Sequence, residues 1–243
     1  MKLLRYGPRG AEKPGLLDAQ GRVRDLSGII PDISGNALRP DGIAALRALD
    51  PETLPLVAGI PQDDLRLGAC VGGIGKYVCI GLNYADHAQE AGMPIPEEPI
   101  IFNKWTSAVV GPNDDIQVPR GSVKTDWEVE LGVVIGEPGA YIDEANAMNH
   151  VAGLCVINDV SERDFQLNRA GTWDKGKGWM RSRGSVRFLV VCLSQSCSPT
   201  NCPAARLSYW SMVTKTTSCP CNRCPKPPKR FRPLGGKRSM PTS

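Results

Sequence analysis

The sequence predicts an α+β chain in which short strands outnumber short helices, and three observations support this class. Residues 126–136 alternate strictly between two faces, which is the period of a β-strand. Short apolar runs that end at polar residues recur at 77–82, 100–104 and 151–160. The helical stretches among these runs are short, and the one at 84–91 lies between a capping asparagine and a glycine.

Composition indicates a globular protein without a membrane partner. The 243 residues suffice for one large domain or two small ones, and 41% hydrophobic content is ordinary for a chain with a core. The first residues lack the apolar run of a signal peptide, and no stretch approaches the roughly 18 apolar residues of a membrane helix. We therefore expect a cytoplasmic protein.

Charge and cysteine content divide the chain near residue 178. Residues 179–243 hold 12 Lys and Arg and no Asp or Glu, whereas the first 178 residues hold 17 basic and 25 acidic residues. Six of the nine cysteines also lie after residue 178. The tail has few aromatic residues and no periodicity, so we expect disorder. Its cysteine cluster has no second pair at ribbon spacing and no histidine, so we expect neither a zinc site nor a nucleic-acid partner.

The first 70 residues form a small leading unit in this interpretation. A polar turn within 15–23 predicts a hairpin, and residues 41–49 predict a short capped helix. Prolines recur along a connector at 51–61, and no residue pattern in this unit indicates a catalytic site. We therefore expect a small β-rich unit at 1–70 and a second unit at 71–178 that carries the candidate site.

A pair of carboxylates marks the clearest strand. Glu128 and Glu130 project from the same face of residues 126–136, and a solvated strand face is the alternative interpretation. Trp127 and Val129 cover the other side, and the apolar continuation favours a buried strand. Two buried carboxylates raise each other's pKa unless a cation lies between them.

A third carboxylate is available at the end of another strand. Asp159 follows the apolar run at 151–158, although alone it could be a turn or cap residue. Ser161 is expected to cap a helix that follows, and a further helix is expected at 143–149. A hard divalent ion such as Mg²⁺ takes oxygen ligands at ~2.0–2.1 Å, so three carboxylates in one place favour a metal site.

His87 and Glu90 stand three residues apart on the predicted helix, so they share a face. A carboxylate beside an imidazole fixes its tautomer and raises its basicity, as a general base requires. An exposed helix pair is the alternative interpretation. Lys104 and Lys177 are candidate partners of a developing oxyanion, although a single lysine more often lies at the surface.

In order and spacing, these residues resemble the fumarylacetoacetate hydrolase family. The Glu-x-Glu-Leu segment combined with the downstream Asp-x-Ser-x-Arg-Asp segment is specific, whereas each alone is weak. Residues 1–70 resemble the variable N-terminal unit of that family. The segments that carry the resemblance are NYADHAQE at 83–90, FNK at 102–104, DWEVELGVVIG at 126–136, NDVSERDFQ at 158–166 and KGK at 175–177.

The resemblance implies a mixed β-roll with few helices, usually as a homodimer, with Mg²⁺ or Mn²⁺ as cofactor. It implies small 2-oxo or enol carboxylic acids as substrates and C–C hydrolysis, decarboxylation, isomerisation or hydration as the reaction. Ureidoglycolate lyase is an alternative activity. The implied roles are metal ligation by Glu128, Glu130 and Asp159, proton transfer by His87 with Glu90 on a lid, stabilisation of enolate charge by Lys177, and substrate contact by Lys104, Arg163 and Gln166.

The resemblance stops after Lys177, where Phe-Gly-Pro, Val-Asp-Gly and Gly-Thr-Pro segments are expected and absent. Back-translated and read two bases on, residues 184–187 can spell Phe-Gly-Pro-Val, and residues 209–213 can spell Leu-Val-Asp-Gly. A shifted reading frame therefore explains residues 179–243 better than a functional tail does. Two hypotheses follow: an enzyme of this family, or a truncated, inactive member whose β-roll is incomplete at the C-terminus.

Overall fold

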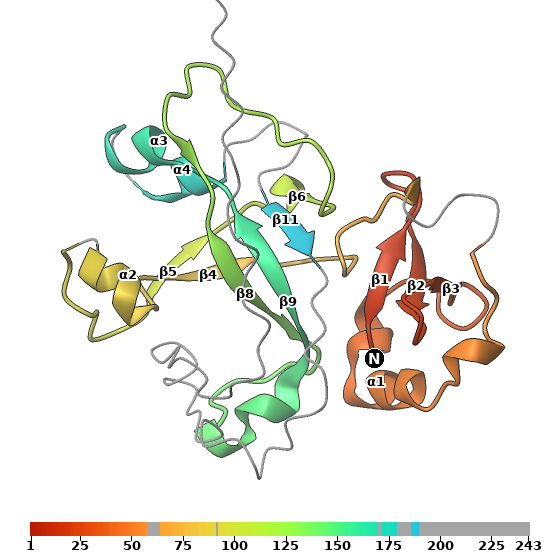
Figure 1. Cartoon of the computed structure of the whole chain (residues 1–243). Helices are drawn as coiled ribbons and strands as arrows, with labels where there is room; N and C mark the ends of the chain where they lie inside the picture. The colour runs from red at the N-terminus through yellow and green to blue at the C-terminus, as the bar shows by residue number, and fades with distance from the viewer. Residues whose placement is uncertain (58–63, 91, 170–171, 179–185, 190–243) are drawn as a thin grey trace, which may run out of the picture.

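The computed structural model of the chain describes residues 1–57, 64–90, 92–169, 172–178 and 186–189. For His87, Glu90 and Val186–Leu189 it describes the backbone alone. Figure 1 shows an N-terminal unit, coloured red to orange, beside a larger unit that holds the other described strands. In these ranges, no helix is long and apolar enough to cross a membrane.

The N-terminal unit contains an antiparallel sheet in the order β1-β2-β3. Asp18 fixes the turn between β2 and β3, because its carboxylate accepts the backbone N–H groups of Gln20 at 3.0 Å and Arg22 at 2.8 Å. The hairpin expected within residues 15–23 is therefore confirmed. The strands are β1 (Leu3–Tyr6), β2 (Lys13–Leu17) and β3 (Val23–Asp25).

In the described part of this unit, one α-helix and two 3-10 helices accompany the sheet. α1 (Pro40–Arg47) confirms the helix expected at 41–49, and η1 (Gly35–Leu38) and η2 (Pro51–Thr53) flank it. Leucines from the sheet, α1 and the intervening segments pack into one buried cluster, which gives the unit an apolar core of its own. Its buried members are Leu16, Leu26, Leu46 and Leu54.

The larger unit is built on a four-stranded sheet in the order β6-β11-β9-β8. β9 (Val151–Asp159) pairs antiparallel with β8 (Val129–Ile135) on one side and with β11 (Val186–Leu189) on the other. β11 also pairs in parallel with β6 (Val109–Val110). β11 falls inside the segment 179–243 that the sequence predicts to be disordered, and the rest of that segment lies outside the described residues.

Two shorter ladders lie beside this sheet, and the candidate residues Lys104 and Arg163 directly follow two of their strands. β4 (Val78–Gly81) pairs with β5 (Ile100–Asn103), and β7 (Thr125–Asp126) pairs with β10 (Ser161–Glu162). The expected strands at 77–82, 100–104 and 151–160 are confirmed. The short connecting helices are α2 (Ala85–Glu90), α3 (Arg163–Leu167), α4 (Asp174–Lys177) and η4 (Thr106–Ala108).

The expected burial of the strand at 126–136 is wrong. The strand is divided into β7 and β8, and the side that Trp127 and Val129 cover is exposed, at 69% and 63%. The core forms on the carboxylate face because the buried residues of β9 lie there. Cys155 and Ile157 pair across the ladder with positions of that face and belong to one buried cluster.

Two helix predictions also need correction. The cap of α3 is Glu162 rather than Ser161, since one Glu162 oxygen accepts the N–H of Phe165 at 2.8 Å and the other that of Lys124 at 2.7 Å. Ser161 is extended in β10. The helix expected at 143–149 is instead the 3-10 helix η5 (Glu144–His150), whose asparagines favour local side-chain hydrogen bonds over a regular α-helix.

Candidate active site

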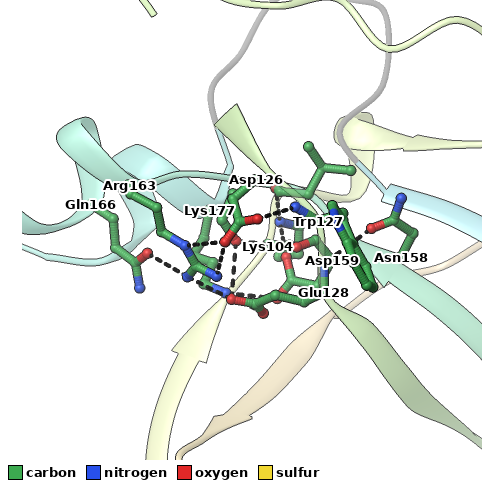
Figure 2. A network of polar contacts seen from close by, with 11 residues as sticks. Lys104, Asp126, Trp127, Glu128, Asn158, Asp159, Arg163, Gln166 and Lys177 are labelled. Carbon is green, nitrogen blue, oxygen red and sulfur yellow. Dashed lines mark hydrogen bonds and ion pairs between the residues drawn. The ribbon is translucent and has the colours of Figure 1, made fainter. Parts of the chain in front are cut away.

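Separate elements bring carboxylates and cations to one place, which Figure 2 shows from close by. Glu128 immediately precedes β8 and Asp159 ends β9. These strands pair, so the two residues are neighbours, and the Asp159 N–H donates to the Glu128 carbonyl at 2.8 Å. Lys104 follows β5, and Lys177 ends α4.

Lys177 joins the two carboxylates. Its Nζ donates to Glu128 Oε2 at 2.6 Å and to Asp159 Oδ2 at 3.2 Å, and the lysine is only 3% exposed. The same nitrogen lies 5.2 Å from the centroid of the Phe102 ring, which Trp173 meets edge-on. Because this apolar wall keeps water away, the ion pairs are stronger here than at a surface.

Lys104 supports Asp159 from the interior. Its Nζ donates to Asp159 Oδ1 and, at 3.1 Å, to the carbonyl of Val160. Burial holds the pKa of Lys104 below its ordinary value, although the charge of Asp159 opposes this shift. Asp159, itself buried, therefore has two ammonium partners.

Arg163 holds Glu128 from the other side. Its Nη1 lies 2.6 Å from Glu128 Oε1 and donates to Gln166 Oε1 at 3.1 Å. Its Nε and Nη2 donate to Asp126 Oδ2 at 3.0 Å and 2.8 Å. Two nitrogens on one carboxylate oxygen restrict the guanidinium, so Asp126 sets the direction in which Arg163 meets Glu128.

Glu130 lies on the same face of β8, and its charge is the least compensated of the three. Burial, followed by the like charges of Glu128 and Asp159, raises the pKa of Glu130 to about 7. The Tyr84 side chain lowers the pKa of Glu130 in part, and burial followed by the charge of Glu130 raises the pKa of Tyr84, so the two side chains lie close to each other. Tyr84 immediately precedes α2, so this contact links α2 to β8.

A sequence profile of the C-terminal region of fumarylacetoacetate (FAA) hydrolases matches residues 76–210, which is more than half of the chain. The chain belongs to the fumarylacetoacetate hydrolase family. The match covers the segments on which the resemblance rests. It also extends past Gly178, into the part of the chain that departs from the expected motifs.

Members of this family from Burkholderia are similar to the chain in sequence. A Burkholderia multivorans protein with a provisional hydrolase name is 66% identical over 179 residues, which are 74% of this chain and 62% of that protein. A similarly named protein of Burkholderia lata is 65% identical over the same shares. The chain thus spans 62% of the length of these curated relatives.

Solved structures show a related fold. A fumarylacetoacetate hydrolase from Exiguobacterium antarcticum is 27% identical with a TM-score of 0.55, over 78% of this chain and 66% of that one. A 5-carboxymethyl-2-hydroxymuconate delta-isomerase from Mycobacterium smegmatis is 27% identical with a TM-score of 0.56, over 82% and 68%. The fumarylacetoacetate hydrolase-like fold is therefore shared, whereas the activities in those names belong to those proteins.

The structure brings most of the predicted site residues together. One network contains Lys104, Glu128, Asp159, Arg163, Gln166 and Lys177, and Glu130 lies within electrostatic reach of it. His87 and Glu90 are both on α2, and their side chains lie outside the described part of the chain. Within that part, no three His, Cys, Asp or Glu side chains are arranged to hold a metal ion.

Sequence reasoning missed Asp126 and Tyr84 as site residues. Both fall within the motifs that carry the family resemblance, but neither has a spacing that indicates its partner. Asp126 acts through Arg163, which lies 37 residues later, and Tyr84 acts through Glu130, which lies on another strand. Only the pairing of β7 with β10 and the approach of α2 to β8 reveal these contacts.

Proposed function

We propose that the chain descends from a divalent-metal-dependent enzyme that acts on small 2-oxo or enol carboxylic acids. The observation that carries this proposal is the buried meeting of Glu128 and Asp159 at the Nζ of Lys177, next to Glu130. Three carboxylates and three cationic side chains in one place can bind both a metal ion and an anionic substrate. Family membership and the names of the neighbouring structures support the substrate class.

The carboxylates fit Mg²⁺ or Mn²⁺ by donor chemistry, since both ions prefer oxygen ligands. Burial, followed by the like charges of Glu128 and Asp159, raises the pKa of Glu130, and a bound cation would oppose that shift. Glu128, Glu130 and Asp159 would hold the ion, and the Lys177 ammonium would move away from Glu128 and Asp159 as it binds. When bound, the ion supplies Lewis-acid polarisation of a 2-oxo oxygen.

The cationic side chains have distinct roles in this proposal. Lys177 donates a proton in a hydrogen bond to the oxygen on which enolate charge develops, and the apolar wall of Phe102 and Trp173 strengthens that interaction. Arg163 and Gln166 bind the substrate carboxylate from the side of α3. Lys104 is buried behind Asp159, so its part is to orient the Asp159 carboxylate rather than to contact the substrate.

His87 and Glu90 remain the proposed acid–base pair. Both lie on α2, and the Tyr84 contact with Glu130 fastens the start of α2 to the strand of the proposed ligands. A His87 imidazole steered by Glu90 would take a proton from water or from the substrate carbon. Which bond then breaks depends on the substrate, so C–C hydrolysis, decarboxylation, isomerisation and hydration, or a ureidoglycolate lyase reaction, are all compatible with this arrangement.

The test starts with metal binding, because binding does not require turnover. Mn²⁺ titrated into the 243-residue chain, followed by electron paramagnetic resonance, should show a site that Glu130→Gln weakens at least tenfold. Glu144→Gln, which changes an exposed carboxylate of η5, is the matched control and should bind Mn²⁺ like the parent. Equal affinity in both variants would remove Glu130 from the proposed site.

A non-catalytic product is the second candidate, and the composition of residues 179–243 favours it. That segment is basic, rich in cysteine and proline, and lacks the family motifs expected there. Assays on oxaloacetate and acylpyruvates with Mg²⁺ or Mn²⁺ separate the two candidates. Metal-dependent turnover that is lost in Lys177→Met supports the enzyme, and Mn²⁺ binding without turnover supports the inactive member.

A further inference from the structure

A cavity of about 340 Å³ lies at the junction of the N-terminal unit and the larger unit. None of the proposed catalytic residues line it. Arg5, Arg9, Glu12 and Arg66 form one side, and the segments 71–74 and 106–111 form the other. A volume of this size suits a small ligand.

Arg66 links the N-terminal unit to the larger unit beside this cavity. Its Nε and Nη2 donate to the carboxylate of Asp114 at 2.7 Å and 2.6 Å, and its Nη1 donates to the carbonyl of Gly7 at 2.8 Å. The guanidinium group of Arg66 is therefore occupied by hydrogen bonds within the protein. A ligand in the cavity therefore needs other donors.

Arg5 and Arg9 supply such donors. Arg5 Nε donates to Asp32 at 2.6 Å, whereas its Nη2 lies 3.7 Å from Glu12, beyond hydrogen-bond length. Its terminal N–H groups therefore make no hydrogen bond to another described residue. Arg9 is exposed and forms no ion pair within the described ranges, and the exposed Thr106 adds a hydroxyl from the opposite wall.

The charges of the lining residues also favour an anion. Asp32 balances the charge of Arg5, and Asp114 and Glu12 both pair with Arg66. Arg9 is therefore the lining guanidinium that has no carboxylate partner among the described residues. Guanidinium groups bind carboxylates and phosphates through two parallel hydrogen bonds. We propose that this cavity binds a small oxyanion, held by the terminal N–H groups of Arg5 and Arg9 and by the hydroxyl of Thr106.

Because its walls come from both units, a bound oxyanion joins the N-terminal unit to the segment that leads into β6. The ligand binds the folded chain alone, so its binding raises the stability of the whole molecule. This site is independent of the proposed metal site and of the proposed catalytic function, neither of which enters the argument. Inorganic phosphate and succinate represent the two sources of such an anion.

The test is calorimetric titration of the 243-residue chain with inorganic phosphate and, separately, with succinate, in a phosphate-free buffer containing EDTA. We expect saturable binding of at least one anion, and the tighter of the two identifies its chemical source. Arg9→Gln should weaken that binding at least tenfold, and Thr106→Val should weaken it severalfold. Neither position makes a hydrogen bond that the fold requires among the described residues.

Arg120→Gln is the matched control, because it removes the same charge from an exposed arginine that does not line the cavity. It should change the affinity less than twofold. Two results overturn the proposal: no saturable binding of either anion, or equal weakening by Arg9→Gln and Arg120→Gln, which would indicate a general charge effect.

Discussion

At the scale of single residues, the free energy of unfolding depends on the ion pairs between the charged side chains of this site. Lys177 is the shared partner of Glu128 and Asp159, and Lys104 is the second partner of Asp159. Removal of one partner of a buried pair costs far more than the pair itself contributes, because the remaining charge is left without compensation. The lysines are therefore structural groups as well as proposed catalytic ones.

The first prediction follows from this dependence. Lys177→Met should lower the free energy of unfolding by about 1.5–3 kcal/mol in EDTA, because Glu128 and Asp159 lose their shared cation but keep Arg163 and Lys104 as partners. Lys175→Met, an exposed neighbour on α4, should change it by less than about 0.5 kcal/mol. Urea unfolding measures both, and added Mg²⁺ should recover part of the Lys177→Met loss. Equal losses in both variants would contradict the shared-cation role.

Glu130 gives a prediction about pH. Its pKa of about 7 in the folded chain lies above the ordinary value of 4.5. Between these values the unfolded chain releases the proton while the folded chain retains it. The free energy of unfolding therefore falls as pH rises from about 4.5 to about 7, and it stays lower above pH 7. The size of this loss is at most on the order of 3 kcal/mol, at about 1.36 kcal/mol for each unit of pKa.

The measurement is urea unfolding in EDTA at several pH values between 4 and 8. Glu130→Gln should remove most of the decline, because the amide has no proton to release. Glu144→Gln should leave it in place. If the parent chain shows no decline across this interval, Glu130 does not hold its proton in the folded state.

The sequence predicted that Glu128, Glu130 and Asp159 converge, and Glu128 and Asp159 do share Lys177, but the sequence did not predict how the basic residues pair with them. Alternation along residues 126–136 placed Glu128 and Glu130 on one face, and the end of an apolar run placed Asp159 at a strand terminus. The sequence analysis named Lys104 and Lys177 as candidates, but no spacing in the sequence indicated their partners. Their contacts depend on where β5 and α4 approach the sheet, which is a tertiary property that local periodicity does not contain.

At the scale of elements, β8 shows why the pattern of a strand does not settle which face is buried. Alternation correctly separated its two faces, but the apolar face was assigned to the interior. The structure buries the carboxylate face, since Cys155 and Ile157 of β9 form the core on that side. The apolar face of β8 is left exposed at the edge of the sheet among the described strands. An exposed apolar edge strand promotes association between chains.

This exposure leads to the third prediction. Replacement of Val129 and Ile135 by threonine should reduce self-association of the chain, because these side chains are 63% and 61% exposed. The free energy of unfolding should change by less than about 0.5 kcal/mol for each, as expected for surface positions. Sedimentation velocity and urea unfolding provide the two measurements.

Val134→Thr is the control on the opposite face. Val134 packs against the buried cluster that contains Cys155 and Ile157, so its replacement should cost stability without reducing association. Unchanged association in the double threonine variant would mean that this face of β8 is not the surface through which chains associate.

At the scale of the whole molecule, composition suggests a division of the chain but predicts no contact. The leading residues contain a sheet and a buried leucine cluster. The change in charge and cysteine content near residue 178 follows the last motif of the proposed site. β11 nevertheless lies beyond that point, and its four residues pair with β9 on one side and with β6 on the other. Composition averages over such short elements and cannot predict them.

The last prediction concerns activity. A version of the gene in which the two-base shift after codon 178 is reversed should encode a protein that turns over 2-oxo acids at least tenfold faster than this chain. The residues of the proposed site all precede residue 178, so both proteins carry them. A site works only when its surroundings hold it within about half an ångström, and residues 190–243 lack the alternating apolar positions from which further strands of a sheet could form.

The experiment compares both proteins on oxaloacetate and acylpyruvates with Mg²⁺ or Mn²⁺, after Mn²⁺ binding has been measured for each. Similar Mn²⁺ affinity with unequal turnover is the expected result, because the carboxylates are common to both and the surrounding structure is not. His87→Ala in the restored protein should then lose most turnover while it keeps Mn²⁺ affinity, which separates proton transfer from metal binding. Equal turnover of the two proteins would show that residues 179–243 support a working site, and the shifted-frame hypothesis would lose its functional consequence.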